Sequence, residues 1–377
     1  MKDSQINPYE HSDIKVKLLK LYLEKYINIL ALAKGVHTVE VFDLFCGEGI
    51  YNNGKEGSPV IILRLIKDIY YKAKKNSNVK FNCNFNDFNN QKTVKLSNYI
   101  SEKKMHYQEM GTLNYHNKDY QIFKDEIVRS SNIKGLKRFI FIDPYGYKNI
   151  SVSDIEGLLS DNNTEVLLFL PTQFMYRFEK KSTPESLYNF LTEVMPEEEQ
   201  GMSRSGVDFI HKLRDGFGDK LKGKHFVDSF IITRNVNEFF ALFFFTSHLY
   251  GFEKFLEAKW SIDEEEGRGW SPKFEEADLF SVIDVQAKTN KFEVNLITFL
   301  SQIRSNIEIH NFTIENRHLT THAVQILKKI QNSNNLIVNN TDNSKPRKGA
   351  FYIGWNEVKT NTIRCFIKYD NNGTIKH

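Results

Sequence analysis

The sequence predicts an α/β fold whose core is a parallel sheet. Two observations carry this prediction: short apolar runs alternate with helical patterns over the first half of the chain, and several of those runs end in aspartate or glycine. The chain has 377 residues, of which 40% are hydrophobic and 26% are charged. That composition is typical of a globular protein and excludes a disordered or fibrous chain, and the length suits two domains.

The elements of the first half follow from hydrophobic spacing. Residues 12–34 are predicted to form a helix, because apolar side chains recur there at helical intervals. Short apolar runs are predicted to be strands buried on both faces. The predicted strands are Val39–Phe45, Val79–Phe85, His106–Leu113, Phe139–Ile142 and Val166–Leu170, and the further helices are Pro59–Lys74, Asn90–Ser101, Tyr120–Ser130 and Val152–Leu159.

The alternation stops after the fifth strand. Residues 172–224 are polar and contain prolines and several glycines, so they are predicted to form a helical insertion or lid. Phe226–Thr233 and Phe239–Thr246 are predicted to be late strands, for which an antiparallel arrangement is open. Gly251–Trp260 is predicted to be a helix. The fold class is therefore a Rossmann-like sheet with a helical insertion.

A charged stretch over 262–290 separates a first domain, residues 1–288, from a second domain, residues 289–377. The order of elements predicted in the second domain, three helical segments and then a hairpin with a basic loop, is that of a winged helix-turn-helix. These elements are helix Glu293–Ser305, a short helical turn from Thr313, helix Thr321–Asn332, and strands Leu336–Asn339 and Ala350–Trp355 around Lys345, Arg347 and Lys348.

The charge is uneven along the chain. Its total is only +4, which is too small to prove a polyanionic partner. Residues 291–377, however, contain 12 lysines and arginines against 6 acidic residues. This basic segment on a near-neutral body predicts that nucleic acid binds through residues 290–377.

The most specific motif is D-L-F-C-G-E-G, from Asp43 to Gly49, at the end of an apolar strand. Its glycines let the backbone pass close to a ligand, and the next helix begins towards the same place. The pattern is not the dinucleotide G-x-G-x-x-G, and a preceding D-x-F is the form found where S-adenosylmethionine binds. Asp43, Phe45, Gly47 and Gly49 are therefore predicted to bind this cofactor, with Asp43 facing its amino group. A βα turn that merely needs glycine is the alternative.

Two further cofactor contacts are predicted with less support from the pattern. A second strand should end in an acid that holds the ribose hydroxyls, and Asp87 is the only acid near the end of Val79–Phe85. A surface-loop residue is the alternative for Asp87. Thr112 or Asn114, near the third strand, is predicted to hydrogen-bond adenine.

The third motif is D-P-Y-G, from Asp143 to Gly146, after the apolar run Phe139–Ile142. The Asp143 carboxylate and the Pro144 carbonyl can accept hydrogen bonds from an exocyclic amino group and orient its lone pair. Tyr145 can stack on a planar base. The pattern resembles the D-P-P-Y motif of amino-directed nucleic-acid methyltransferases, with one proline missing. Asp143, Pro144 and Tyr145 are the predicted catalytic residues, and a βα turn begun by Asp-Pro is the alternative.

The remaining features of the sequence indicate few further functional residues. Lys15 is able to approach the site, but an exposed lysine is the favoured interpretation. Gly57, Ser58 and Pro59 are predicted to cap a helix, with a chance of lining the substrate cleft. The three cysteines are scattered, and no metal-ligand spacing occurs. The polar start of the chain and the absence of a long apolar run predict a cytoplasmic protein without a membrane segment.

Taken together, these motifs resemble those of the three-Cys-motif partner proteins. The resemblance rests on the H-S-D-I-K run from His11 to Lys15, on D-L-F-C-G-E-G, on Gly57-Ser58-Pro59 and on D-P-Y-G, and it covers roughly residues 9–260. It implies a class I methyltransferase fold, a bacterial or phage origin and a partner protein that carries the three cysteines. The family more often has a plain glutamate where Asp87 stands, which concerns the ribose contact.

Three functions follow for testing. The first is an S-adenosylmethionine-dependent methyltransferase acting on an amino group of a nucleic-acid base, with adenine N6 preferred. The second is a non-catalytic subunit of the same fold that binds nucleic acid or the partner protein, in which a winged helix can also pair two chains into a homodimer. The third is methylation of a small molecule or a protein.

Overall fold

The computed structural model describes residues 10–73, 78–146, 150–179, 183–221, 223–235, 238–271 and 287–370. Contacts divide these residues into unit 1, with residues 10–254 and 268–271, and unit 2, with residues 255–267 and 287–370. The predicted domain boundary at residue 288 differs from this division. Residues 255–267, which precede that boundary, already belong to unit 2.

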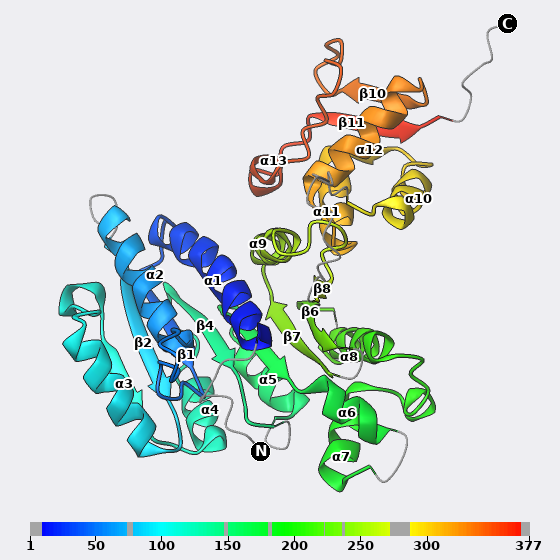
Figure 1. The fold of residues 1–377 in the computed structure, drawn as a ribbon. Coiled ribbons are helices and arrows are strands. Elements are labelled where there is room, and N and C mark those ends of the chain that lie inside the picture. The colour runs from blue at the N-terminus through cyan, green and yellow to red at the C-terminus, as the bar shows by residue number, and fades with distance from the viewer. Residues whose placement is uncertain are drawn as a thin grey trace, which may run out of the picture. The chain divides into compact units, whose positions relative to one another are not determined.

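The described part of unit 1 is built on an eight-stranded sheet with the order β3-β2-β1-β4-β5-β7-β6-β8 (Figure 1). Strands β1 to β5 run parallel, and β7 runs antiparallel to both β5 and β6. The order 3-2-1-4-5 is that of a Rossmann-like sheet, so the predicted fold class is confirmed for this unit. The strands are β1 Thr38–Asp43, β2 Lys80–Asn86, β3 Leu113–His116, β4 Leu136–Ile142, β5 Thr164–Leu170, β6 Phe226–Asn235, β7 Glu238–Thr246 and β8 Gly269–Trp270.

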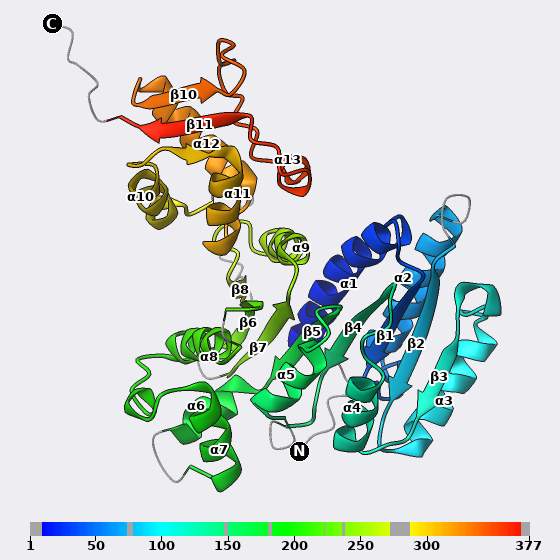
Figure 2. The ribbon, with the colours of Figure 1, turned by 180° about the vertical axis from the view of Figure 1, so that it is seen from behind.

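Helices cover both faces of this sheet. Figures 1 and 2 show α1 and α2 on one face and α4 and α5 on the other. The central strand β5 is buried at every position, as expected for a parallel strand that is covered on both sides. The helices of unit 1 are α1 Glu10–Ala31, α2 Ser58–Ala73, α3 Asn90–Glu102, α4 Tyr120–Arg129, α5 Val152–Leu159, α6 Thr172–Glu179, α7 Glu185–Val194 and α8 Gly206–Lys220, while α9 Leu249–Trp260 ends in unit 2.

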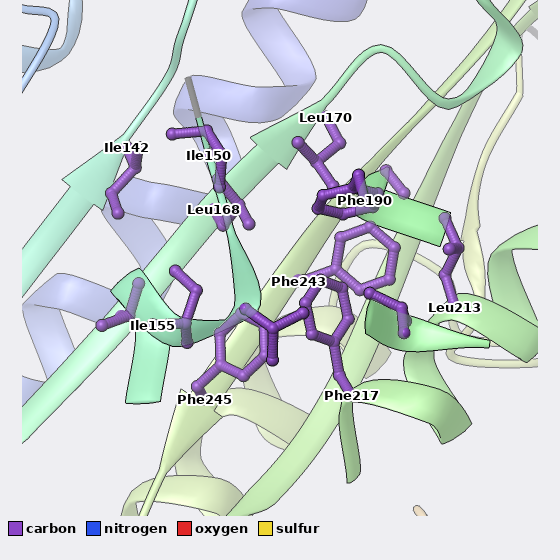
Figure 3. Close-up of a cluster of buried hydrophobic side chains, with 14 of the residues drawn as sticks. Ile142, Ile150, Ile155, Leu168, Leu170, Phe190, Leu213, Phe217, Phe243 and Phe245 are labelled. Carbon is purple, nitrogen blue, oxygen red and sulfur yellow. The ribbon is translucent and has the colours of Figure 1, made fainter. Parts of the chain in front are cut away.

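The segment predicted as an insertion or lid is helical, but its helices α6 to α8 are part of the core. Figure 3 shows Phe190 of α7 and Phe217 of α8 meeting Phe243 and Phe245 of β7 and side chains of β5 and α5. Phe217 lies 5.1 Å from Phe245 between ring centroids. The apolar faces of these helices are buried against the sheet, so the prediction of a lid is wrong for this segment.

The third strand lies further along the chain than predicted. It is β3, Leu113–His116, and a 3₁₀ turn over Gln108–Met110 occupies the region predicted as strand. Gly111 explains the shift: its φ is +146°, and a Cβ there would lie 2.2 Å from the carbonyl oxygen of Phe81. The chain can meet β2 this closely only at a glycine, and β3 starts after it.

The two late strands are confirmed as an antiparallel pair. β6 pairs with β7 from Phe226↔Thr246 to Asn235↔Glu238, with an irregularity near Thr233. Because β7 also pairs antiparallel with β5, the hairpin extends the parallel sheet on its far side.

Unit 2 has its own core beneath a three-stranded antiparallel sheet with the order β10-β11-β9. Leu296, Ile309, Leu327 and Ile367 are fully buried in this core. The elements, after the end of α9, are α10 Asn290–Phe299, β9 Arg304–Ser305, α11 Asn306–Glu315, α12 Thr320–Asn332, β10 Leu336–Asn340, α13 Trp355–Lys359 and β11 Cys365–Tyr369.

Three predictions for this unit are wrong. The helical turn predicted to begin at Thr313 is the last turn of α11, which begins at Asn306. The helix predicted over Glu293–Ser305 ends at Phe299, because Ser305 caps the next helix through a capping box with Glu308. The strand predicted at Ala350–Trp355 is not a strand; β10 instead pairs with β11, from Leu336↔Tyr369 to Asn340↔Cys365. The loop between these strands therefore holds the short helix α13 as well as the basic residues.

Crossing a bilayer requires a long apolar helix, and none of the helices in the described residues has both properties.

Candidate functional site

Three acidic residues follow three neighbouring strands at one edge of the sheet. Asp43 is the last residue of β1 and is level with Phe85 of β2 and Phe141 of β4. Asp87 and Asp143 each come two residues after those positions. The site therefore lies at the carboxyl ends of the strands, where the order reverses between β1 and β4, which is the position at which open α/β sheets bind ligands.

The glycine loop after β1 packs tightly beneath this edge. Gly47 and Gly49 have φ angles of +62° and +77°. A Cβ on Gly49 would lie 2.3 Å from Cδ1 of Leu96 in α3, so the loop admits no side chain there. The amide of Cys46 donates to the carbonyl of Asn86, at 2.9 Å, which ties the loop to the end of β2.

Asp43 is a fully buried carboxylic acid at the centre of the site. The Ser58 hydroxyl donates to its Oδ2 at 2.6 Å, and the Phe45 amide donates to its Oδ1 at 3.3 Å. Burial, with a contribution from the charge of Asp143, raises the pKa of Asp43 to about 7, although the hydrogen bond from Ser58 acts in the opposite direction. This buried acid would be stabilised in its charged form by a cationic ligand group.

Asp87 is also buried and connects two parts of the site. Its Oδ2 accepts a hydrogen bond from the Gly47 amide at 3.1 Å, and its Oδ1 accepts one from the Asn89 amide at 2.9 Å. The Tyr145 hydroxyl lies 3.5 Å from the same Oδ2. Asp87 thus fixes the glycine loop, and it is buried, unlike an exposed surface-loop residue.

The D-P-Y-G segment continues directly from β4. Pro144 is buried, whereas Tyr145 is 55% exposed. The Tyr145 ring meets the edge of Phe45 at 6.5 Å between centroids, and the Lys92 ammonium of α3 lies 4.7 Å above the Tyr145 ring. The structure therefore brings Phe45 and Tyr145, predicted from separate motifs, into one aromatic group.

Lys15 corrects an expectation from the sequence. The favoured interpretation was an exposed lysine, but Lys15 is buried in α1 and forms an ion pair with Oδ2 of Asp143. Burial by itself would lower the pKa of Lys15, and the neighbouring Asp143 carboxylate raises it above its ordinary value. The lysine is therefore a stable positive charge inside the site.

A pocket opens between these elements. Asp43 lies beneath it and Asp143 forms part of its wall. Its lining comes from the glycine loop, the following turn and the start of α2, so Gly57 and Ser58 line this pocket. The lining residues are Phe45, Cys46, Glu48, Gly49, Ile50, Tyr51, Gly57, Ser58 and Asp143.

Thr112 is not brought together with the other predicted residues. It precedes β3, and its backbone amide donates to the side-chain oxygen of Asn82, near the start of β2. Because β2 and β3 run parallel, this is the opposite end from Asp87. Asn114 pairs with Asn84 midway along the strands, also short of the edge. Asn117 lies at the carboxyl end of these two strands, on the same side as Asp87. Its side-chain amide donates to the backbone carbonyl of Asp87 at 3.1 Å.

Sequence reasoning missed Tyr51, the burial of Lys15 and the hydrogen bond from Ser58 to Asp43. A signal for Ser58 was present, since Pro59 in the first turn of α2 places Ser58 at a helix start that points towards the end of β1. Tyr51 and Lys15 carried no local signal, because their contacts with the site come from the packing of a loop and a distant helix. Among the described residues, no group of three or more histidine, cysteine or acidic side chains is placed to hold a metal ion.

No family model matches the chain, and no curated protein matches it. The resemblance to the three-Cys-motif partner proteins thus gains no support from these comparisons.

Solved structures similar to the chain include methyltransferases. An O-methyltransferase from Bacillus cereus in complex with SAH aligns with 10% identity and a TM-score of 0.35, over 64% of this chain and 84% of that one. Trm1 from Pyrococcus horikoshii with S-adenosyl-L-methionine aligns with 11% identity and a TM-score of 0.36, over 68% of this chain and 61% of that one. The bifunctional kinase-methyltransferase WbdD aligns with 11% identity and a TM-score of 0.36, over 66% of this chain and 44% of that one. With TM-scores below 0.5, these similarities assign no activity to this chain.

Proposed function

We propose that the chain is an S-adenosylmethionine-dependent methyltransferase that acts on an exocyclic amino group of a nucleic-acid base, with adenine N6 as the first candidate. The observation that supports the proposal is the convergence of Asp43, Asp87 and Asp143 on one edge of the sheet, around a glycine loop and beside a pocket that Asp143 lines. Parallel α/β sheets bind their ligands at this edge.

The residues present fit the proposed cofactor. Asp43 would face its cationic amino group, and the pKa of about 7 that burial gives this acid matches a site completed by a positive charge. Gly49 lines the pocket, and its φ of +77° is a conformation that favours glycine, so the backbone there can border a ligand. The Asp87 carboxylate accepts from two backbone amides and from the more distant Tyr145 hydroxyl, and as a carboxylate it has capacity left to accept hydrogen bonds from ribose hydroxyls. When bound, the cofactor would supply the methyl group.

The acceptor would enter from the side of β4. There, the Asp143 carboxylate and the Pro144 carbonyl can accept the two N–H bonds of a planar amine. The exposed ring of Tyr145 can stack on the base, which is worth roughly 1–3 kcal/mol for each stacked base. A base inside a duplex would have to be extruded, at a cost of a few kcal/mol.

We propose that unit 2 is a winged helix that contacts nucleic-acid phosphates. Its order of helix, strand, two helices and two strands suits that motif. Lys345, Arg347 and Lys348 are exposed in the loop between β10 and β11. The Gly349 amide donates to Gln331 of α12 at 2.9 Å, so the loop is held against that helix. Replacing these three basic residues by alanine should weaken DNA or RNA binding and make its salt dependence less steep.

Calorimetric titration with S-adenosylmethionine tests the cofactor first. The wild-type protein should bind it saturably, and Asp43→Ala should weaken binding at least about 100-fold, since a charged hydrogen-bond partner is lost. Asp125→Ala, at an exposed carboxylate of α4 outside the pocket, is the matched control and should bind normally. Absence of binding by the wild-type protein would contradict the proposal.

Transfer of a labelled methyl group from the cofactor tests the reaction. Duplex DNA, heat-denatured DNA and total RNA serve as acceptors, and the product nucleoside identifies the methylated atom. Asp143→Ala should abolish transfer while cofactor binding persists. Label found on protein rather than nucleic acid would contradict the proposed substrate class.

A specific observation favours one alternative, a non-catalytic subunit of the same fold. Asp143 is engaged by Lys15, so its carboxylate is not wholly free for a substrate. On this alternative the chain binds nucleic acid or the partner protein implied by the family resemblance, alone or as a homodimer. Nucleic-acid binding without methyl transfer, unchanged by Asp143→Ala, would decide for it.

A further inference from the structure

Lys15 is a buried lysine on a helix whose neighbouring lysines are exposed. Its exposed fraction is 7%, whereas Lys17 and Lys20 of α1 are exposed to solvent. Removing an ammonium group from water costs several kcal/mol unless a partner of opposite charge compensates. A buried lysine at the wall of a candidate site therefore needs a specific explanation.

The Lys15 ammonium has three N–H donors, and its hydrogen bond to Asp143 uses one of them. The ammonium is paired with Oδ2 of Asp143 and lies 4.5 Å from the centroid of the Phe169 ring. Within the described ranges no further hydrogen bond is formed by this ammonium, and none is formed by Oδ1 of Asp143. The Asp143 side chain is 23% exposed and lines the pocket, so one oxygen is held and the other remains available.

The helix fixes where Lys15 can reach. Two turns along α1, the Tyr22 hydroxyl donates to Glu165 of β5, and the Tyr22 ring packs 4.7 Å from Phe244 and 5.9 Å from Phe139, between centroids. These contacts are on the face of the sheet that α1 covers. Lys15 is thus presented to Asp143 from a rigid element, which suits a positioning role better than a mobile surface chain would.

The groups that raise the pKa of Lys15 come from three elements. Asp143 follows β4, Asp43 ends β1, and Tyr51 belongs to the turn after the glycine loop, and all three act on the charge of Lys15. Lys15 in turn opposes the effects of burial and of Asp143 on the pKa of Asp43. Without Lys15, the cation that offsets the mutual repulsion of the Asp43 and Asp143 carboxylates would be lost.

We propose that Lys15 is a positioning residue for methyl transfer: its ammonium holds Oδ2 of Asp143 so that Oδ1 faces the pocket and accepts one N–H of the substrate amine. This inference rests on the proposed function and adds to it the residue that orients the acceptor carboxylate. Lys15 itself touches neither the amine nor the methyl group.

The decisive variants are Lys15→Met, which keeps length without charge, and Lys15→Arg, which keeps the charge. Transfer of labelled methyl groups should fall about 100-fold or more in Lys15→Met, as expected when a reacting group is misplaced by about 1 Å. Calorimetric affinity for S-adenosylmethionine should stay within about tenfold, since Lys15 acts on Asp43 only through space. Lys15→Arg should recover part of the transfer rate. Lys17→Met, at the exposed lysine nearby, is the control and should behave as wild type.

A second measurement examines the ion pair without any reaction. Lysines are acylated with acetic anhydride at pH 8 and quantified by mass spectrometry. Lys15 should react clearly more slowly than Lys17 and Lys20 of the same helix, because its ammonium is buried and is held in its protonated form by Asp143. Asp143→Asn should increase the labelling of Lys15 and leave Lys17 unchanged.

Each contrary outcome overturns a different part of the proposal. Equal labelling of Lys15 and Lys17 would overturn the ion pair. Undiminished transfer by Lys15→Met would overturn the positioning role, and a parallel loss of cofactor affinity and transfer would make Lys15 a cofactor ligand instead. If the wild-type protein binds no cofactor, the proposed function itself fails, and that is established before any Lys15 variant is compared.

Discussion

Two buried acids in unit 1 share one electrostatic property but lie in different surroundings. Burial raises the pKa of both Asp43 and Glu165 to about 7. Asp43 ends β1 beneath the pocket, beside the glycine loop. Asp43 accepts a hydrogen bond from Ser58, which lines the pocket, whereas Glu165 is the second residue of β5 and lies near the amino end of its strand.

The partners of Glu165 explain its place in the structure. Tyr22 of α1 donates to its Oε2, and the Thr246 hydroxyl at the end of β7 donates to its Oε1 at 2.8 Å. A Cβ on Gly251 would lie 2.2 Å from the same Oε1, so the group is enclosed by α9 as well. Glu165 connects a helix, two strands and a following helix, which is a structural role.

A raised pKa therefore indicates burial and does not by itself indicate function. Strongly perturbed acids do gather at active sites, but structural polar networks perturb them as well. What distinguishes Asp43 is its position at a strand end, with close-packed glycines and a second carboxylate across the pocket.

The largest effect should separate the two acids in cofactor binding. Asp43→Asn should weaken calorimetric affinity for S-adenosylmethionine at least about 100-fold, equivalent to about 3 kcal/mol. Glu165→Gln should change the affinity less than about twofold, because Glu165 is outside the pocket. Equal losses in both variants would contradict the assignment of Asp43 to the cofactor site.

The second effect concerns stability against pH. Glu165 keeps its proton up to about pH 7 when folded, but loses it near its ordinary value of 4.5 when unfolded. Its stabilising contribution is therefore present below pH 4.5 and is lost as the pH rises through 7. Urea unfolding from pH 5 to 8 should show a decline that Glu165→Gln reduces by up to about 3 kcal/mol. Asp43 contributes a decline of the same sign, so an unchanged slope in Glu165→Gln would contradict the assignment to Glu165.

A smaller effect should follow from removing one donor to Glu165. Tyr22→Phe should lower the free energy of unfolding by about 1–2 kcal/mol at pH 6, because the acid loses a buried hydrogen bond. Tyr71→Phe, at an exposed tyrosine of α2, should change it by less than about 0.5 kcal/mol. Equal effects would show that the Tyr22 hydroxyl is not important for the packing of α1.

The smallest effect is expected at the exposed tyrosine of the D-P-Y-G segment. Tyr145→Phe removes the hydroxyl near Asp87 but keeps the ring, so cofactor affinity should change less than about threefold. Tyr145→Ala should reduce methyl transfer clearly more than Tyr145→Phe does, since stacking requires the ring. Similar transfer rates for the two variants would exclude the stacking role.

The sequence was sufficient for the parts of the fold that are specified locally. The buried runs around Val41, Ile140 and Leu168 have the continuous apolar pattern of parallel strands, and all three lie in β1, β4 and β5. Strand ends marked by Asp43 and Asp143 were also predictable, because an acid or glycine after an apolar run breaks the strand. Boundaries failed where a single backbone contact decided them, as at Gly111 against Phe81.

The partners of these residues depend on contacts between distant parts of the chain. Thr112 has suitable chemistry, but the parallel pairing of β2 and β3 places it at the wrong end of the sheet. Lys15 precedes Asp143 by 128 residues, and no local pattern distinguishes it from the exposed Lys17.

By itself, the sequence determined the α/β alternation, the glycine loop and the three acids at strand ends, since each depends on neighbouring residues and backbone preference. The tertiary structure alone decided which carboxylate meets Ser58, which meets Lys15, and that Glu165 is closed inside the molecule. These choices depend on how sheet register and helix packing bring distant side chains together, and on the burial that results, which sets the free energy of each charge.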